Sequence, residues 1–263
     1  MSKHSKWAKI KRKKGVADVK RGAVFTKLTN NVTIAVKEGS GSNPTMNFKL
    51  RLAVDAARAQ NVPKENIERA IARGLGKGSG TELEQLVFEG YGPGKVAVIV
   101  EVTTDSRNRS VSELKHAFSA AGGAIGGPGS VSWQFERKGV VRIQGSPSTS
   151  SGNKYSPTKP ASAEVGAWRG SWDALELQLI DAGADDITTD DEVITITTPV
   201  ENLKHLSDTI TKLNLAVDEA ALEWIANKTT TITDLEAQEK IADFLNELEE
   251  REDVTGVYIN ATL

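Results

Sequence analysis

The sequence has no cysteine among its 263 residues and only three histidines. Disulfide bonds and thiolate metal sites are therefore excluded. The longest apolar run is about five residues, VAVIV at 96–100, whereas a membrane-spanning helix needs about 20. The basic N-terminus is not followed by an apolar segment. We therefore expect neither a signal peptide nor a membrane span.

Recognisable catalytic motifs are also missing. His4, His116 and His205 fall in three different regions, and none has a second ligand at metal-binding spacing. The stretch GLGKGS (74–79) lacks the Ser or Thr that follows the lysine of a phosphate-binding loop, and AGGAIGGPGS (121–130) follows a predicted helix instead of opening one. We therefore expect no enzymatic activity, no cofactor and no metal.

The sequence does show a strong segregation of charge. Residues 1–80 contain 18 Lys or Arg and 5 Asp or Glu, a net charge of +13, whereas residues 81–263 contain 15 and 30, a net charge of −15. HSKWAKIKRKKG, residues 4–15, places six Lys or Arg around a single tryptophan, Trp7. A solvated basic face is the commoner fate of a charge run, but an excess this large indicates a polyanion-binding segment joined to an acidic body.

Hydrophobic periodicity predicts a three-helix bundle before residue 80. An apolar stripe with a period of about four residues predicts a first helix over 18–38. Asn43 and Pro44 match the N-cap and first position of a second helix that buries Met46. Pro63 opens a third helix, which ends near Gly74. The glycine-rich stretch that follows predicts a flexible linker.

After the linker the pattern changes to alternating strands and helices. Val96 to Val102 is almost continuously apolar, as in a strand covered on both faces. Residues 144–170 contain fifteen Gly, Pro, Ser or Thr among twenty-seven, a composition that predicts a disordered insertion. Strands are expected at 87–91, 96–104, 130–135, 139–143, 186–190, 192–198, 221–226 and 256–260, and helices at 108–121, 171–182, 200–213 and 233–250.

This order predicts an α/β (α+β) protein with three domains. Residues 139–228 follow the order β-α-β-β-α-β, a ferredoxin-like unit. The segment before it lacks a second helix and a last strand, and the end of the chain has one of each left over. We therefore expect a basic arm and helical domain (1–80), a discontinuous second ferredoxin-like domain (81–138 and 229–263) and an inserted domain (139–228) that carries the insertion 144–170.

Basic and aromatic side chains are the candidate nucleic-acid contacts, because Lys and Arg attract phosphate and an aromatic face can stack on a base. Trp7 either stacks on a base or packs the arm onto the bundle, whereas Phe25 is better explained as helix core. Arg107, Asn108 and Arg109 either grip a phosphate at a helix N-terminus or cap that helix. The candidates are Lys3, His4, Lys6, Trp7, Lys9, Lys11, Arg12, Lys13, Lys14, Lys20, Arg21, Lys27, Arg107 and Arg109.

Several stretches together resemble the YebC/PmpR-type family: HSKW (4–7), KRGAVFTKL (20–28), NVPKENIERAIARG (61–74), FEGYGPG (88–94) and DSRNRS (105–110). The resemblance implies a three-domain α/β fold with a helical N-terminal domain and a non-enzymatic role. Some members of that family are described as DNA-binding transcriptional regulators and others as translation factors that act on the ribosome. The 144–170 insertion and the run Lys11-Arg12-Lys13-Lys14 depart from the usual family pattern.

Two functions follow as hypotheses. The first is a ribosome-associated, RNA-binding translation factor or translational activator, whose partner is ribosomal RNA. The second is a duplex-DNA-binding transcriptional regulator, which needs a recognition helix. The candidate is the third helix, with Lys64, Asn66, Glu68, Arg69 and Arg73. We expect a monomer. The insertion favours the mitochondrial matrix, with a bacterial-type cytoplasm as the alternative.

Overall fold

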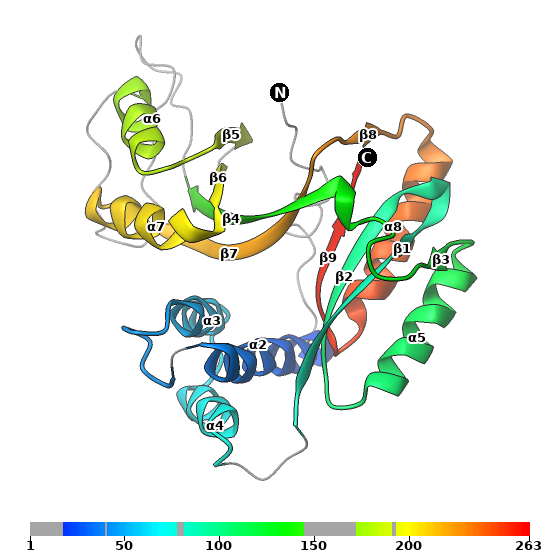
Figure 1. Ribbon diagram of the computed structural model, residues 1–263, viewed down its shortest axis with the longest axis horizontal. Helices are drawn as coiled ribbons and strands as arrows, with labels where there is room; N and C mark the ends of the chain where they lie inside the picture. The colour runs from blue at the N-terminus through cyan, green and yellow to red at the C-terminus, as the bar shows by residue number, and fades with distance from the viewer. Residues whose placement is uncertain (1–17, 40, 78–81, 145–171, 191–192) are drawn as a thin grey trace. The chain divides into compact units, whose positions relative to one another are not determined.

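The computed structural model describes residues 18–39, 41–77, 82–144, 172–190 and 193–263 (Figure 1). The chain divides into two compact units, Met1–Glu136 with Trp224–Leu263, and Arg137–Glu223. Helices come first along the chain and antiparallel sheets follow, which confirms the mixed α/β class. The finer division into three domains with boundaries near 80, 138 and 228 stays a prediction.

The helical region at the start of the chain packs around one apolar core. Its helices are α2 (Asp18–Glu38), α3 (Phe48–Ala59) and α4 (Lys64–Gly74). The predicted stripe of α2 turns inward, so that Val32 and Val36 are buried against Leu50 and Ile67, and Phe25 packs against this core. Gly74 lets α4 approach α2 closely, since a Cβ there would lie 2.6 Å from Val36 Cβ.

Helix α3 begins four residues later than the sequence predicts, so the prediction at Asn43 and Pro44 is wrong. Asn47 is the N-cap, and its side chain accepts from Leu50 N at 3.0 Å while its Nδ2 donates to Ala35 O at 2.8 Å. Asn43 instead closes a turn in which its Oδ1 accepts from the backbone N of Thr45. Met46 lies in this turn and is 75% exposed, not buried.

Sheet β3-β1-β2-β9 forms the centre of the first unit and is antiparallel throughout. Strand β9, from the C-terminal part of the chain, completes this sheet. The same part of the chain contains a short parallel pair, β8 with β10. The bounds are β1 (Glu84–Tyr91), η1 (Pro93–Lys95), β2 (Ala97–Thr104), α5 (Arg107–Ala120), β3 (Ala124–Ile125), β8 (Thr230–Thr231), α8 (Leu235–Glu250), β9 (Val254–Ile259) and β10 (Ala261–Thr262).

Strand β2 is buried along its whole length, which confirms the prediction of a strand covered on both faces. One face, which includes Val100, packs on α5 and α8, where Phe118 and Phe244 meet edge to face at 5.0 Å between ring centroids. The other face, which includes Ile99, packs against Phe135. This double burial explains why the strand has no polar alternation.

The strand predicted over 130–135 is wrong. Residues Ser132–Gln134 form a 3₁₀ turn, η2, and the strand begins only at Phe135. The cause is Glu89 on β1, whose buried carboxylate accepts from the backbone N–H groups of Gly129, Val131 and Ser132, each at 2.8 Å. N–H groups that converge on one carboxylate cannot alternate in direction as a strand requires.

The unit Arg137–Glu223 contains a four-stranded antiparallel sheet in the order β5-β6-β4-β7, with two crossover helices. This order is the ferredoxin-like one that the sequence predicts for this region. Most predicted elements here are found, although strand β7 starts four residues earlier and helix α7 follows a separate 3₁₀ turn. The bounds are β4 (Phe135–Gln144), α6 (Trp172–Asp181), β5 (Asp186–Asp190), β6 (Val193–Pro199), η3 (Val200–Asn202), α7 (Leu203–Lys212) and β7 (Val217–Ala226).

Buried aliphatic side chains from every layer fill the core of this unit, among them Ile143, Leu179, Ile196 and Leu206. On β4, the guanidinium of Arg142 forms a two-pronged pair with Glu223, with Nη2 2.8 Å from Oε2, and contacts Glu219 at 3.1 Å. The insertion 144–170 is predicted to be disordered. Its residues from 145 on lie outside the described part of the chain, so this stays a prediction.

Candidate nucleic-acid interface

The predicted contact residues fall into three groups in the structure. The arm residues from Lys3 to Lys14 lie outside the described part of the chain, so their role stays a prediction. Lys20 and Arg21 belong to the first turn of α2, where only the backbone is described. Lys27, Arg107 and Arg109 are described. They come from two different elements, α2 and α5.

The first turn of α5 presents Arg107, Asn108 and Arg109 to solvent. Arg109 Nη2 lies 3.0 Å from Asp105 Oδ1, and Arg107 Nη1 lies 3.8 Å from Glu84 Oε2. The two arginine side chains are 54% and 66% exposed. Ion pairs with this exposure contribute little to stability, so a phosphate group can exchange for either carboxylate at small cost.

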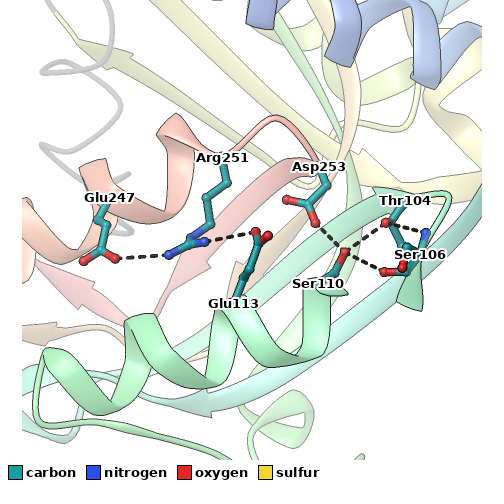
Figure 2. A network of polar contacts seen from close by, with 7 residues as sticks. All are labelled: Thr104, Ser106, Ser110, Glu113, Glu247, Arg251 and Asp253. Carbon is teal, nitrogen blue, oxygen red and sulfur yellow. Dashed lines mark hydrogen bonds and ion pairs between the residues drawn. The ribbon is translucent and has the colours of Figure 1, made fainter. Parts of the chain in front are cut away.

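Ser110 fixes the position of this turn, as Figure 2 shows. It is fully buried, and its hydroxyl donates to Asp253 Oδ2 in the segment just before β9. Its oxygen also lies 2.9 Å from Thr104 Oγ1, which accepts from the backbone N of Ser106 at 3.0 Å. The end of β2, the start of α5 and the start of β9 are thereby held together.

A second group of contacts links α5 to the end of α8. Arg251 lies between Glu113 on α5 and Glu247 on α8, with nitrogen-to-oxygen distances of 3.2 Å to each carboxylate (Figure 2). The arginine side chain is 20% exposed, so this three-residue contact is only partly screened by water. Together with the Ser110 contacts it ties α5 to the end of α8 and to the segment before β9.

Lys27 has a structural role in addition to its predicted one. Its Nζ donates to the carbonyl oxygen of Glu249 in the last turn of α8. A cation at this end of a helix is favourable, because the last carbonyl groups have no partner within the helix. Lys27 therefore joins the helical region to α8. Its contact with phosphate stays a prediction.

The exposed aromatic residues Trp133 and Tyr91 are not among the predicted contacts. Trp133 falls in a predicted strand, where its exposure cannot be foreseen, and Tyr91 belongs to the FEGYGPG stretch. The structure explains that stretch by packing: a Cβ on Gly90 would lie 2.5 Å from Ala124 O, and Gly94 has a φ of +66° in the tight turn.

Metal-binding and membrane-spanning features are both missing from the described residues. Within them no group of His, Cys, Asp and Glu has the arrangement of a metal site, and His116 and His205 are both exposed. No helix in the described ranges is long and apolar enough to cross a bilayer.

The chain matches two family models in succession. Residues 5–77 match the TACO1/YebC protein N-terminal domain, and residues 83–261 match the TACO1/YebC second and third domain. A crystal structure of a conserved hypothetical protein from Aquifex aeolicus superposes with a TM-score of 0.81 at 38% identity, covering 98% of this chain and 96% of that one. The helical region and sheets thus define a known architecture over nearly the whole length.

Curated relatives extend over the same length. One from Chloroflexus aurantiacus is 43% identical over 261 residues, which is 99% of this chain and 95% of the relative. One from Chlorobaculum tepidum is 40% identical over 261 residues, which is 99% of this chain and 94% of the relative. Both are described as probable transcriptional regulatory proteins. The chain therefore belongs to the TACO1/YebC family, as the sequence motifs indicate.

Proposed function

We propose that this protein is a non-enzymatic regulatory protein that acts by binding nucleic acid, and that its target is RNA on the ribosome. It would then be a translation factor or translational activator. The observation that carries the proposal is the segregation of charge, +13 over residues 1–80 against −15 over the rest. The relatives' description as probable transcriptional regulatory proteins supports the regulatory class, and its wording fits the DNA-binding alternative better than a ribosomal target.

The basic charge continues beyond the arm into the helical region. Residues 18–77 contain eleven Lys or Arg and five Asp or Glu, and the seven Lys or Arg of residues 1–17 have no acidic neighbour in that stretch. Each phosphate that such a surface neutralises releases counterions, so log affinity falls by about 0.7 per contact on a single strand and about 0.9 on a duplex as log salt rises. The acidic body lowers the affinity of the other surfaces for RNA.

The alternative is a duplex-DNA regulator, which the relatives' description as transcriptional regulatory proteins favours. Its candidate recognition helix is α4, but the side chains that would face bases contact one another. Lys64 Nζ lies 3.6 Å from Glu68 Oε1, and Asn66 Oδ1 accepts from Arg69. Such exposed contacts exchange at small cost and do not decide between the two targets. We favour RNA bound by charge because Lys and Arg are denser in residues 1–17 than on α4.

Sucrose-gradient sedimentation tests the first proposal. The full-length chain and a form that lacks residues 1–15 are each run with ribosomes. We expect the full chain to co-migrate with ribosomes and the shortened form to stay at the top of the gradient. Free sedimentation of both forms would reject a ribosomal target.

A gel-shift competition tests the alternative. A duplex that contains one promoter competes with random duplex of equal length for the full chain. A preference for the promoter would favour the transcriptional regulator, whereas equal competition supports binding by charge alone.

The relatives from Chloroflexus aurantiacus and Chlorobaculum tepidum are bacterial proteins. Their source agrees with a bacterial-type cytoplasm, which we propose as the site of action, and gives no support to the mitochondrial matrix that the insertion suggests. The monomeric state stays a prediction.

A further inference from the structure

Two aromatic side chains of the first unit are exposed at one place. Trp133 is 70% exposed and Tyr91 is 38% exposed. The indole N–H of Trp133 donates to Ser130 O at 3.2 Å, and the Tyr91 hydroxyl donates to the same oxygen at 3.3 Å. One carbonyl group therefore holds the polar tips of both rings, and both residues remain exposed to water.

The backbone that carries Trp133 is held in place by a buried acid. The carboxylate of Glu89 accepts three backbone N–H groups from residues 129–132, immediately before the indole. Burial alone raises the pKa of Glu89, but these hydrogen bonds outweigh it and hold the pKa below its ordinary value, so the carboxylate is charged at neutral pH. An exposed indole on a rigid turn is preorganised for a partner, since little conformational entropy is lost on contact.

Three side-chain amides are linked to the two aromatic residues by hydrogen bonds, directly or through one another. Gln134 Nε2 lies 3.4 Å from the Tyr91 hydroxyl, Asn227 Nδ2 donates to Trp133 O at 3.3 Å, and Asn260 Nδ2 donates to Gln134 Oε1 at 2.8 Å. Amide groups both donate and accept hydrogen bonds, and they match the polar edges of unpaired bases. We name Tyr91, Trp133, Gln134, Asn227 and Asn260 the Trp133 surface.

The charge of the loops that form the Trp133 surface differs from that of the body around it. Residues 92–96, 126–134 and 227–230 contain no Asp or Glu and two lysines, Lys95 and Lys228. Both lysines are exposed. The segment 81–263 as a whole has a net charge of −15. These loops carry two lysines against one contacting carboxylate, that of Glu89, which accepts from the backbone of residues 129–132, so they are less acidic than the body as a whole.

We propose that Trp133 and Tyr91 stack on an unpaired base of a single-stranded nucleic acid, with Lys228, which follows Asn227 in the sequence, near an adjoining phosphate. Every base has a π-face on which an aromatic ring can stack, but bases in a duplex are already covered by their neighbours. The surface therefore selects single strands over duplexes. This inference rests on the proposed function and adds a second contact, far in sequence from the basic arm.

Fluorescence anisotropy of the full-length chain tests the inference. The probes are labelled single strands of about 12 nucleotides, a length within the usual site size of single-strand binders, as RNA and as DNA of the same sequence, beside a duplex of equal length. We expect Trp133→Ala to weaken single-strand binding about tenfold, the usual effect of losing one stacked base. Trp133→Phe should keep most of the affinity, because a phenyl ring still stacks.

Controls separate stacking from other effects. Leu177→Ala removes a side chain that is 63% exposed in the other unit, and it should leave all affinities unchanged. The slope of log affinity against log salt should be the same for Trp133→Ala and the unaltered chain, because no phosphate contact is lost. A loss confined to the RNA or to the DNA probe supports stacking and identifies the target.

Equal losses on single strand and duplex would overturn the inference, and so would unaltered binding by Trp133→Ala. If the unaltered chain binds both kinds of probe with a steep salt dependence and Trp133→Ala matches it, only the stacking inference fails. If the unaltered chain binds no probe at any salt concentration, the proposed function fails with it.

Discussion

Ser110 on α5 donates its hydroxyl hydrogen to Asp253, which lies 143 residues further along the chain. Both residues are buried, at 0% and 9% exposure. The contact joins the helix that presents Arg107 and Arg109 to the segment that leads into the last long strand. The position of the exposed arginines therefore depends on residues at the far end of the chain.

Replacement of either partner should destabilise the first unit. Ser110→Ala leaves a buried carboxylate without this donor, so we expect the free energy of unfolding to fall by about 1–3 kcal/mol. Asp253→Ala should cost a similar amount, and the double variant less than the sum of the two because the contact is lost only once. Urea denaturation measures these differences. Ser112→Ala, an exposed position on the same helix, is the matched control. Strictly additive losses would show that the contact contributes nothing.

Gly90 should tolerate no side chain. An added Cβ would lie 2.5 Å from Ala124 O and 2.8 Å from Phe118 Cε1. Gly90→Ala must therefore push strand β3 or the core apart, at a cost of about 1–3 kcal/mol. Gly127, where an added Cβ would meet nothing within 4 Å, provides the control, and Gly127→Ala should leave thermal unfolding unchanged. Equal melting temperatures for the two variants would contradict this packing.

Removing one partner of the Arg142–Glu223 ion pair should destabilise the fold more than removing both. Burial lowers the pKa of Arg142, but the contacts with Glu223 and Glu219 outweigh it and hold the pKa above its ordinary value. Arg142→Met leaves Glu223, whose side chain is 18% exposed, with its main cation gone, at a cost of about 3 kcal/mol. Arg142→Met combined with Glu223→Met should cost less than the single change, because no buried charge is left unpaired. Guanidinium denaturation compares them, and a larger loss in the double variant would refute the argument.

Glu89 should make stability depend on pH in the acidic range. Its pKa in the folded chain lies below the ordinary value of 4.5, so its stabilising effect is complete above about pH 4.5 and is lost as the pH falls through the folded-state value. Glu89→Gln should lower the free energy of unfolding by about 1–3 kcal/mol at pH 7. The difference from the unaltered chain should shrink on acidification. Denaturation curves at several pH values check this, and a difference that stays constant down to about pH 3 would contradict it.

The fold can be predicted where residues close in sequence decide the structure. Helix α2 has the predicted bounds because its stripe of Leu28, Val32 and Val36 needs no distant partner to define a helix. Strand β2 follows from its continuous apolar run. The turn at 132–134 cannot be predicted, because Glu89, which determines it, lies about 40 residues earlier. The start of α3 is ambiguous in the sequence because Asn43 and Asn47 are both good caps, and only packing selects Asn47.

The candidate site can likewise be predicted from the sequence only where neighbouring residues decide its structure. The charge of the arm and the exposure of Arg107 and Arg109 follow from composition and from a helix start. The exposure of Trp133 does not, because an indole in a run of alternating residues looks like a strand side chain. Its surroundings come from Tyr91, Asn227 and Asn260, which are distant in sequence and meet only in the folded unit.

The position of β9 late in the sequence affects the order in which the two units fold during synthesis. Chains fold as they leave the ribosome, N-terminal parts first, and β9 emerges after β1, β2 and the whole β5-β6-β4-β7 sheet. Until it does, β2 lacks one of its two neighbours, and the unpaired N–H and C=O groups along that edge of this apolar strand stay open to pairing with other chains. The four strands of the β5-β6-β4-β7 sheet are complete some thirty residues sooner. The unit Arg137–Glu223 can therefore fold before the unit whose sequence flanks it, because the central sheet of the flanking unit has to wait for β9.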